Sequence, residues 1–196
     1  MGGYRILDKF RSYRCTACAA AFGLLCLLAA PTAAGSQSRK LQAINSYCKE
    51  LQSAFSNATP FVFAGPDPWT EIDELPAKMP DEAVAYLYTT GAEIRWVFIR
   101  IVDEQDGWSE DLNYFYRDDG TLAKRTRQVQ SRAANLVLDV TSYFEEGKLL
   151  KESHKHHALA SGKQDTSQFV DPDAPVYWTT DDLPFPEILD LWQRLA

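Results

Sequence analysis

The chain has 196 residues, a length typical of one domain, and 45% of them are hydrophobic and 24% charged. These proportions are close to globular averages and exclude a wholly disordered chain, a collagen-like chain and a protein with several membrane spans. The 27 acidic and 20 basic residues give a net charge of −7, which argues against a general nucleic-acid binder, whose surface would be basic.

The first 36 residues have the pattern of a secretory leader. Four basic residues precede an apolar run at 17–30, ACAAAFGLLCLLAA, which is followed by Pro31 and a run of small residues. The apolar run is shorter than the roughly 20 residues of a membrane-spanning helix. We therefore predict a signal peptide over 1–36 and a single exported domain over 37–196, periplasmic or secreted. The alternative is an uncleaved leader that anchors the protein, which would be its one attachment to a membrane.

The cysteines support an exported domain without an internal disulfide. Three of the four, Cys15, Cys18 and Cys26, lie in the predicted leader, so cleavage leaves Cys48 alone. One cysteine cannot form an intramolecular bridge. Cys48 falls on the apolar side of a predicted helix, which favours a small buried hydrophobe over a reactive thiol or an intermolecular bridge.

Residues 39–57 are predicted to form a helix, because apolar residues recur there at spacings of three and four: Leu41, Ile44, Cys48, Leu51 and Phe55. The next segment, 60–82, carries five of the ten prolines and six acidic residues. Proline prevents long regular elements. We therefore expect an extended connector over 60–82, with an acidic ligand-binding loop as the alternative.

Six strands are predicted from 84 to 158, over 84–89, 93–103, 111–117, 121–130, 136–145 and 148–158. In the strand 93–103, Ile94, Trp96 and Phe98 should face one way and Val97, Ile99 and Ile101 the other, so we expect a central strand covered on both sides. The N-terminal helix should cover one side. The mostly polar strand 121–130 is expected near an edge of the sheet.

Apolar residues near the end of the chain predict a short C-terminal helix over 184–195. The resulting fold class is α+β, with an N-terminal helix packed on an antiparallel meander of about five to seven strands.

Two predicted hairpins share the pattern Tyr-x-acid-acid-Gly-x-Leu-x-Lys, at 116–124 and again 27 residues later at 143–151. The pattern resembles the hairpins of MORN-variant repeat proteins. It covers nine residues twice, and two copies fall short of the three or more that a repeat array needs. The resemblance therefore implies no function. The glycines of both turns, Gly120 and Gly147, are expected to adopt positive φ.

All three histidines lie in the stretch 154–157. On a strand, Glu152, His154 and His156 share a face and form the best candidate metal triad. We nevertheless favour a solvated strand end, because the sequence has no HExxH or CxxC motif and no second histidine cluster to complete a site. No metal and no other cofactor is therefore expected.

A basic stretch of Lys124, Arg125, Arg127 and Arg132 contains no acid between 121 and 134. Arg125 and Arg127 share one face of a strand and are the candidate ligand-binding residues for an anionic group. Two other interpretations stay open. In one, the charges protect an edge strand from pairing with other chains; in the other, they meet the protein's own acidic tail.

The sequence contains neither a GxSxG motif nor a phosphate-binding glycine loop. The favoured hypothesis is therefore a non-catalytic exported binding module for a small apolar ligand or an envelope protein, with no nucleic-acid partner. One alternative is a hydrolase-like enzyme with a site near His154–His157. Another is a structural surface protein held by its leader.

Overall fold

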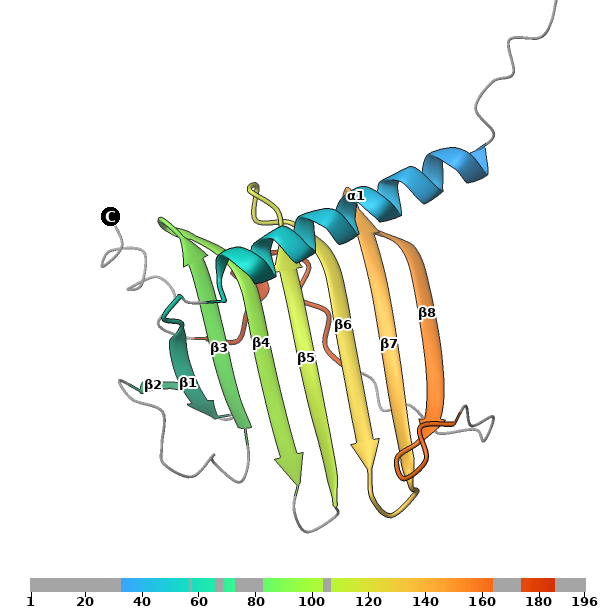
Figure 1. Ribbon diagram of the computed structural model, residues 1–196. Coiled ribbons are helices and arrows are strands. Elements are labelled where there is room, and N and C mark those ends of the chain that lie inside the picture. Colours follow the sequence, from blue (N-terminus) through green and yellow to red (C-terminus); the bar gives the residue numbers. More distant parts are fainter. Residues whose placement is uncertain are drawn as a thin grey trace, which may run out of the picture.

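The computed structural model describes residues 33–56, 58–65, 69–72, 83–103, 107–163 and 174–185. They form one helix, an eight-stranded sheet and a single turn of 3-10 helix (Figure 1). The elements are α1 (Ala33–Ala54), β1 (Phe61–Gly65), β2 (Thr70–Ile72), β3 (Ala83–Thr90), β4 (Glu93–Asp103), β5 (Trp108–Tyr116), β6 (Leu122–Ser131), β7 (Leu136–Glu145), β8 (Lys148–Ala158) and η1 (Thr180–Asp182). The predicted α+β class is confirmed. Residues 1–32 of the predicted leader lie outside the described residues, and its last four, 33–36, form the start of α1. Nearly all of the predicted C-terminal helix also lies outside the described residues.

The strand order is β2-β1-β3-β4-β5-β6-β7-β8, and every neighbouring pair is antiparallel. From β3 to β8 the sheet is the predicted meander. The sequence interpretation was wrong at 60–82, where β1 and β2 add two strands and bring the number to eight. The prolines there flank the two strands instead of interrupting them, and proline is tolerated at strand ends.

The expectation that the strand at 121–130 lies near an edge was also wrong. β6 is hydrogen-bonded to β5 on one side and to β7 on the other. Its polar sequence misled because two buried arginines, Arg125 and Arg127, occupy inward positions that apolar residues usually fill. Polarity in this strand therefore does not mean exposure.

The helix α1 lies obliquely across one face of the sheet, close to one end of the strands (Figure 1). Cys48, Leu51 and Phe55 pack against Phe115 of β5, with Tyr88 and Trp96 beside them. Toward its N-terminus the helix reaches β7, where Lys40 Nζ lies 2.6 Å from Glu145 Oε2. We call the face of the sheet that α1 crosses the helix face.

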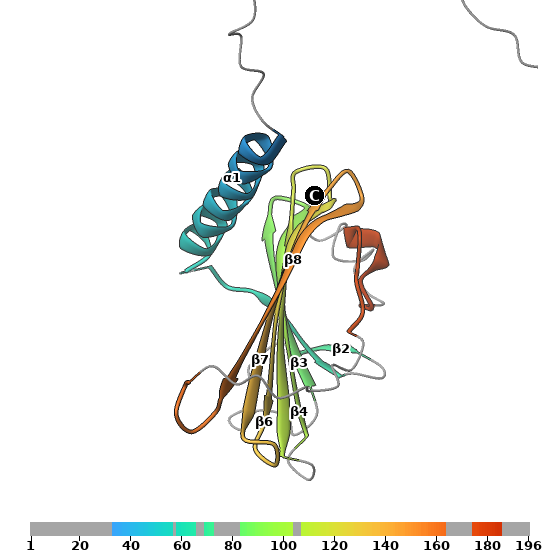
Figure 2. The same ribbon diagram turned by 90° about the vertical axis from the view of Figure 1, so that its right-hand side faces the viewer.

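Residues 174–185 cover the opposite face, as the edge-on view in Figure 2 shows for the red segment. This C-terminal strap is attached through its backbone. Pro175 O accepts a hydrogen bond from Tyr114 Oη at 2.9 Å, and Trp178 O accepts one from Leu122 N at 2.9 Å. The main core lies between sheet and strap and includes Phe63, Trp69, Leu87, Val97, Leu112, Tyr114, Tyr116, Leu183 and Phe185. We call this side the strap face.

A β-bulge at Arg95 corrects the predicted faces of the strand at 93–103. Tyr88 pairs with Trp96 and Thr89 with Ile94, so Arg95 is the extra residue. As a result Ile94 belongs to the core of the strap face, whereas Trp96 packs beneath α1. The extra residue reverses the alternation of side chains along the strand. The buried Arg95 guanidinium pairs with Asp118 and Glu93.

Both glycine turns have the predicted positive φ, 75° at Gly120 and 68° at Gly147. The two loops nevertheless differ despite their matching sequences. Glu145 pairs with Lys148 across a two-residue turn in which Glu146 also has positive φ, whereas the other loop is wider and closes with Arg117 N donating to Thr121 O. The sequence repeat therefore does not extend to the turn geometry.

Candidate functional site

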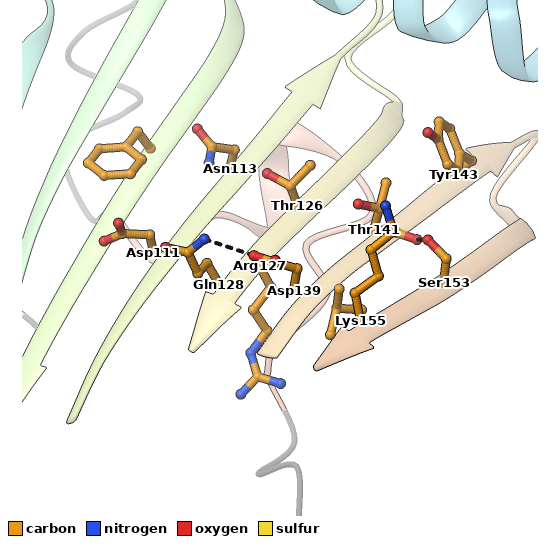
Figure 3. Close-up of a pocket in the computed structure, with 12 residues that line it drawn as sticks. Asp111, Asn113, Thr126, Arg127, Gln128, Asp139, Thr141, Tyr143, Ser153 and Lys155 are labelled. Carbon is orange, nitrogen blue, oxygen red and sulfur yellow. Dashed lines mark hydrogen bonds between the residues drawn. The ribbon is translucent and has the colours of Figure 1, made fainter. Parts of the chain in front are cut away.

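The helix face is only partly covered by α1, and a polar hollow with a volume of about 500 Å³ lies on the uncovered part. We call this hollow the trough. The lining residues come from five consecutive strands, β4 to β8, and Figure 3 labels most of those on β5 to β8. They are Phe98, Asp111, Asn113, Thr126, Arg127, Gln128, Asp139, Val140, Thr141, Tyr143, Ser153 and Lys155.

The trough follows directly from strand alternation. In β5, Asp111 and Asn113 face it while Leu112 and Tyr114 between and beyond them are buried on the strap face. Antiparallel pairing aligns the polar positions across strands, so that Asn113 is opposite Thr126. Thr126 is in turn opposite Thr141, which is opposite Ser153. One row of hydroxyl and amide groups thus crosses the sheet.

Hydrogen bonds within the trough hold several of these side chains in place. Gln128 Nε2 donates to Asp139 Oδ1 at 2.8 Å, the dashed line between these residues in Figure 3. Trp96 Nε1 donates to Asn113 Oδ1 at 3.0 Å. At the end nearest α1, Tyr143 Oη lies 3.2 Å from Asn45 Oδ1 of the helix. The trough is therefore ordered before any ligand arrives, which lowers the entropy cost of binding.

Asp111 is the most unusual group in the trough. Its Oδ1 atom is buried and has no hydrogen-bond partner among the described residues, although Arg100 Nε forms an ion pair with it at 3.3 Å. Burial raises the pKa of the Asp111 carboxyl above its ordinary value, and the charge of Arg100 opposes this shift. A buried acceptor without a hydrogen bond can gain from a ligand that brings a donor.

Aromatic rings line the side of the trough toward β3. Phe98 is part of the lining, and the Tyr86 ring lies beside it with the ring centroids 5.8 Å apart. Nearer to α1, the Trp96 ring stacks on the Tyr88 ring with the ring centroids 4.6 Å apart. The trough thus combines flat apolar surfaces with hydrogen-bonding groups, the usual composition of a small-molecule site.

A second hollow of about 500 Å³ adjoins the trough at the end of the strands farthest from α1. We call it the arginine hollow. Two contacts connect it with the trough: the Arg100–Asp111 ion pair, and a hydrogen bond of 2.7 Å from Gln130 Nε2 to Gln128 Oε1. Its lining residues are Arg100, Val102, Asp103, Gly107, Trp108, Ser109, Gln130 and Arg132.

The predicted ligand-binding residues Arg125 and Arg127 point to the strap face. Arg125 Nη1 donates to the carbonyls of Ala174 and Pro175, both at 3.2 Å, and Arg127 Nε pairs with the buried Glu110. Of the three sequence interpretations, the edge-strand one was wrong. The interpretation in which the basic stretch meets the C-terminal tail describes Arg125 best. Arg125 contacts backbone carbonyls of that tail, however, and not the acidic side chains that the interpretation named. That either arginine binds a ligand stays a prediction.

Glu152 and His154, from the weak metal triad, do lie together, with His154 Nε2 2.9 Å from Glu152 Oε1. Ser142 Oγ donates to Glu152 Oε2 at 2.6 Å, and this bond, together with His154, holds the pKa of the Glu152 carboxyl below its ordinary value. No group of three or more His, Cys, Asp or Glu side chains in the described ranges is placed to hold a metal ion. His156 faces the same side, and the expectation that these residues hold no metal stays a prediction.

The order of groups at Glu152 bears on the hydrolase alternative. A hydroxyl nucleophile needs a base within hydrogen-bond reach, with an acid behind that base. Here the carboxylate lies between the Ser142 hydroxyl and the His154 imidazole. Ser142 is also fully buried. This order of groups differs from that of a Ser-His-acid triad, and the hydrolase alternative stays a prediction.

Cys48 is buried under α1 with 2% of its surface exposed, as predicted for a small hydrophobe. Burial raises the pKa of its thiol to about 11. The thiol is therefore protonated at neutral pH and unreactive.

Sequence reasoning missed the trough, although a signal for it was present. Polar residues recur at alternate positions in the middle of three predicted strands: Asp111 and Asn113, Thr126 and Gln128, and Asp139 and Thr141. Pairing register, which the sequence does not state, was needed to assemble the polar positions into one surface.

Comparison with known proteins finds no relative of this chain: no protein-family model matches it, and no curated protein or solved structure matches significantly. Across the described residues, α1 included, no helix has the length and apolar character needed to cross a membrane.

Proposed function

We propose that this protein is an exported, non-catalytic binding module whose trough holds a small hydroxyl-rich ligand of the oligosaccharide type. The observation that carries the proposal is the composition of the trough. Amide, hydroxyl and carboxylate groups from four strands, β5 to β8, converge beside the Phe98 ring of β4, over a volume within the range of about 300–1,000 Å³ usual for ligand sites.

The donor and acceptor pattern fits a polyhydroxylated ligand. Each sugar hydroxyl both donates and accepts, and the trough offers carboxylates as acceptors, Lys155 as a donor, and amides and hydroxyls that do both. Aromatic rings such as Phe98 present flat apolar faces on which the C–H side of a sugar ring can pack. The mixture of neutral groups with both signs of charge disfavours a purely apolar ligand in this place.

Export is part of the proposal and rests on the leader pattern at 1–36. The sequence hypothesis of a small apolar ligand stays a prediction. A more apolar hollow of about 470 Å³, between α1 and the loop after β5, is where such a ligand would bind; its lining includes Ala43, Ile44, Tyr47 and Ala123.

The test is isothermal titration calorimetry of the folded protein with neutral and acidic oligosaccharides. We expect at least one to bind, and the double variant Thr126→Val and Thr141→Val to lose about tenfold or more in affinity because two hydroxyls leave the trough. Valine keeps the branched shape and the strand preference of threonine, so stability should change little.

The matched control is Thr90→Val at the exposed end of β3, which removes a hydroxyl outside the trough and should leave the affinity unchanged. Tryptophan fluorescence offers a second readout, because Trp96 is hydrogen-bonded to Asn113 in the trough. If no oligosaccharide binds, or if the double variant binds as well as the parent, the trough is not the site.

A further inference from the structure

The arginine hollow extends the trough along β4, β5 and β6 and changes its chemical character. The trough has carboxylates in its lining, whereas the adjoining hollow contains two guanidinium groups, those of Arg100 and Arg132, against the single carboxylate of Asp103. The surface therefore passes from hydroxyl-binding to anion-binding chemistry between two adjoining hollows.

The two arginines differ in how they are held. Arg100 is half-exposed and oriented by its ion pair with Asp111. Arg132 is exposed, and its side chain makes no ion pair among the described residues. Its backbone N–H donates to Gly107 O at 2.9 Å, and its carbonyl accepts a hydrogen bond from Asn135 N at 3.1 Å. The guanidinium of Arg132 is thus available, and the strand end that carries it is fixed.

The rest of the hollow suits a charged sugar ring. Trp108 supplies a flat aromatic surface, and Ser109 and Gln130 supply hydrogen-bonding groups. A guanidinium forms paired hydrogen bonds with the planar carboxylate and matches sulfate equally well.

On these grounds we propose that the trough and the arginine hollow together bind a short acidic oligosaccharide, with its neutral part in the trough and its anionic group on Arg100 and Arg132. This inference rests on the proposed function, and it adds the ligand class and the direction in which the chain lies. The ligand should be short, because the protein has a net charge of −7 and repels the further negative charges of a long polyanion. Salt screens the interaction between charges that lie more than about 8 Å apart.

The experiment compares trigalacturonic acid, its methyl ester and a sulfated trisaccharide within the same titration panel. The methyl ester has the same sugar skeleton as trigalacturonic acid but carries no charge. We expect the acidic forms to bind about tenfold more tightly than the neutral ester, and rising salt to weaken the acidic forms alone. The carboxylated and sulfated arms show which anionic group is preferred.

The diagnostic variant is Arg132→Gln, since among the described residues only the backbone of Arg132 forms hydrogen bonds. It should weaken binding of acidic ligands about threefold to tenfold and leave neutral ligands unchanged. Arg39→Gln, an exposed arginine on α1, removes the same charge outside the hollow and is the control.

Three outcomes separate the two proposals. Acidic binding that Arg132→Gln weakens supports both. Equal binding of acidic and neutral oligosaccharides, with Arg132→Gln silent, overturns the acidic ligand and leaves the trough standing. Failure of every oligosaccharide in the panel overturns the proposed function and the ligand class with it.

Discussion

The two faces of the sheet are built from the same strands and have opposite roles. On β5, Leu112 and Tyr114 are at most 2% exposed beneath the strap, whereas their neighbours Asp111 and Asn113 are part-exposed in the trough. Polar groups occur on both faces. On the strap face Arg125 and Glu110 are buried and have partners in their own chain. On the helix face, polar groups remain in contact with solvent.

This difference shows where the chain uses its surface for stability and where for binding. Burial of the apolar face contributes roughly 25 cal/mol for each Å² removed from water, and the strap is the element that makes the burial complete. The helix face beyond α1 contributes little in this way, so its residues can be exchanged at low cost to the fold. The following predictions test that division.

The largest contrast should come from neighbouring strands. Leu112→Ala on the strap face should lower the free energy of unfolding by about 3 kcal/mol, since it leaves a cavity in a closed core. Thr126→Val on the helix face should change it by less than about 0.5 kcal/mol. Chemical denaturation of both variants measures this. Similar losses would mean that the helix face is also part of the stabilising core.

A smaller contrast is expected between the two glycine turns. Valine at either position is strained by positive φ, at a cost of about 1–2 kcal/mol. At Gly120 an added Cβ would also lie 3.1 Å from Thr180 Oγ1 of the strap, whereas at Gly147 it meets open space.

Gly120→Val should therefore destabilise more than Gly147→Val, as measured by their denaturation midpoints. Equal midpoints would show that the strap moves away from the new Cβ at position 120 without a loss of stability. Midpoints equal to the parent's in both variants would contradict the positive φ itself.

The smallest effects concern two carboxyls whose pKa values move in opposite directions. Glu152 has a lowered pKa, so its contribution to stability is present above the ordinary value and is lost as the pH falls through the lowered one. Asp111 has a raised pKa, so its charged form costs stability at neutral pH and that cost disappears on acidification.

Carboxyl NMR titration should show these opposite pKa shifts of Glu152 and Asp111 directly. Ser142→Ala should raise the pKa of Glu152, because the Ser142 hydrogen bond is the main cause of its shift. Ser153→Ala, on the opposite face of the neighbouring strand, is the control and should leave it unchanged. A Glu152 pKa that does not respond to Ser142→Ala would exclude this hydrogen bond in solution.

Much of the fold could be predicted from residue patterns. Helical spacing located the apolar side of α1, alternation located the strands from β3 to β8, and Gly147 marked a turn with positive φ. The predictions failed at 60–82, where prolines were taken to exclude strands, and at Ile94, where a bulge reversed the alternation. Both failures concern local exceptions that depend on neighbouring strands.

The candidate site was predicted less well, for a reason visible in Arg125 and Arg127. Their charges indicated a surface role, yet both side chains are buried on the strap face with partners far away in the chain. The groups that do face an open hollow, such as Thr126 and Asn113, belong to types common on any polar strand. Nothing in one strand distinguishes them.

The sequence by itself determined the alternation of polar and apolar side chains, because that alternation is a local property of each extended strand. Only the tertiary structure decided which alternate face became a core and which became a trough. Pairing register brought polar residues from four strands, β5 to β8, side by side, the strap covered one face, and α1 covered only part of the other. Those contacts join residues distant along the chain, and their free energy depends on surfaces that exist only after the sheet has formed.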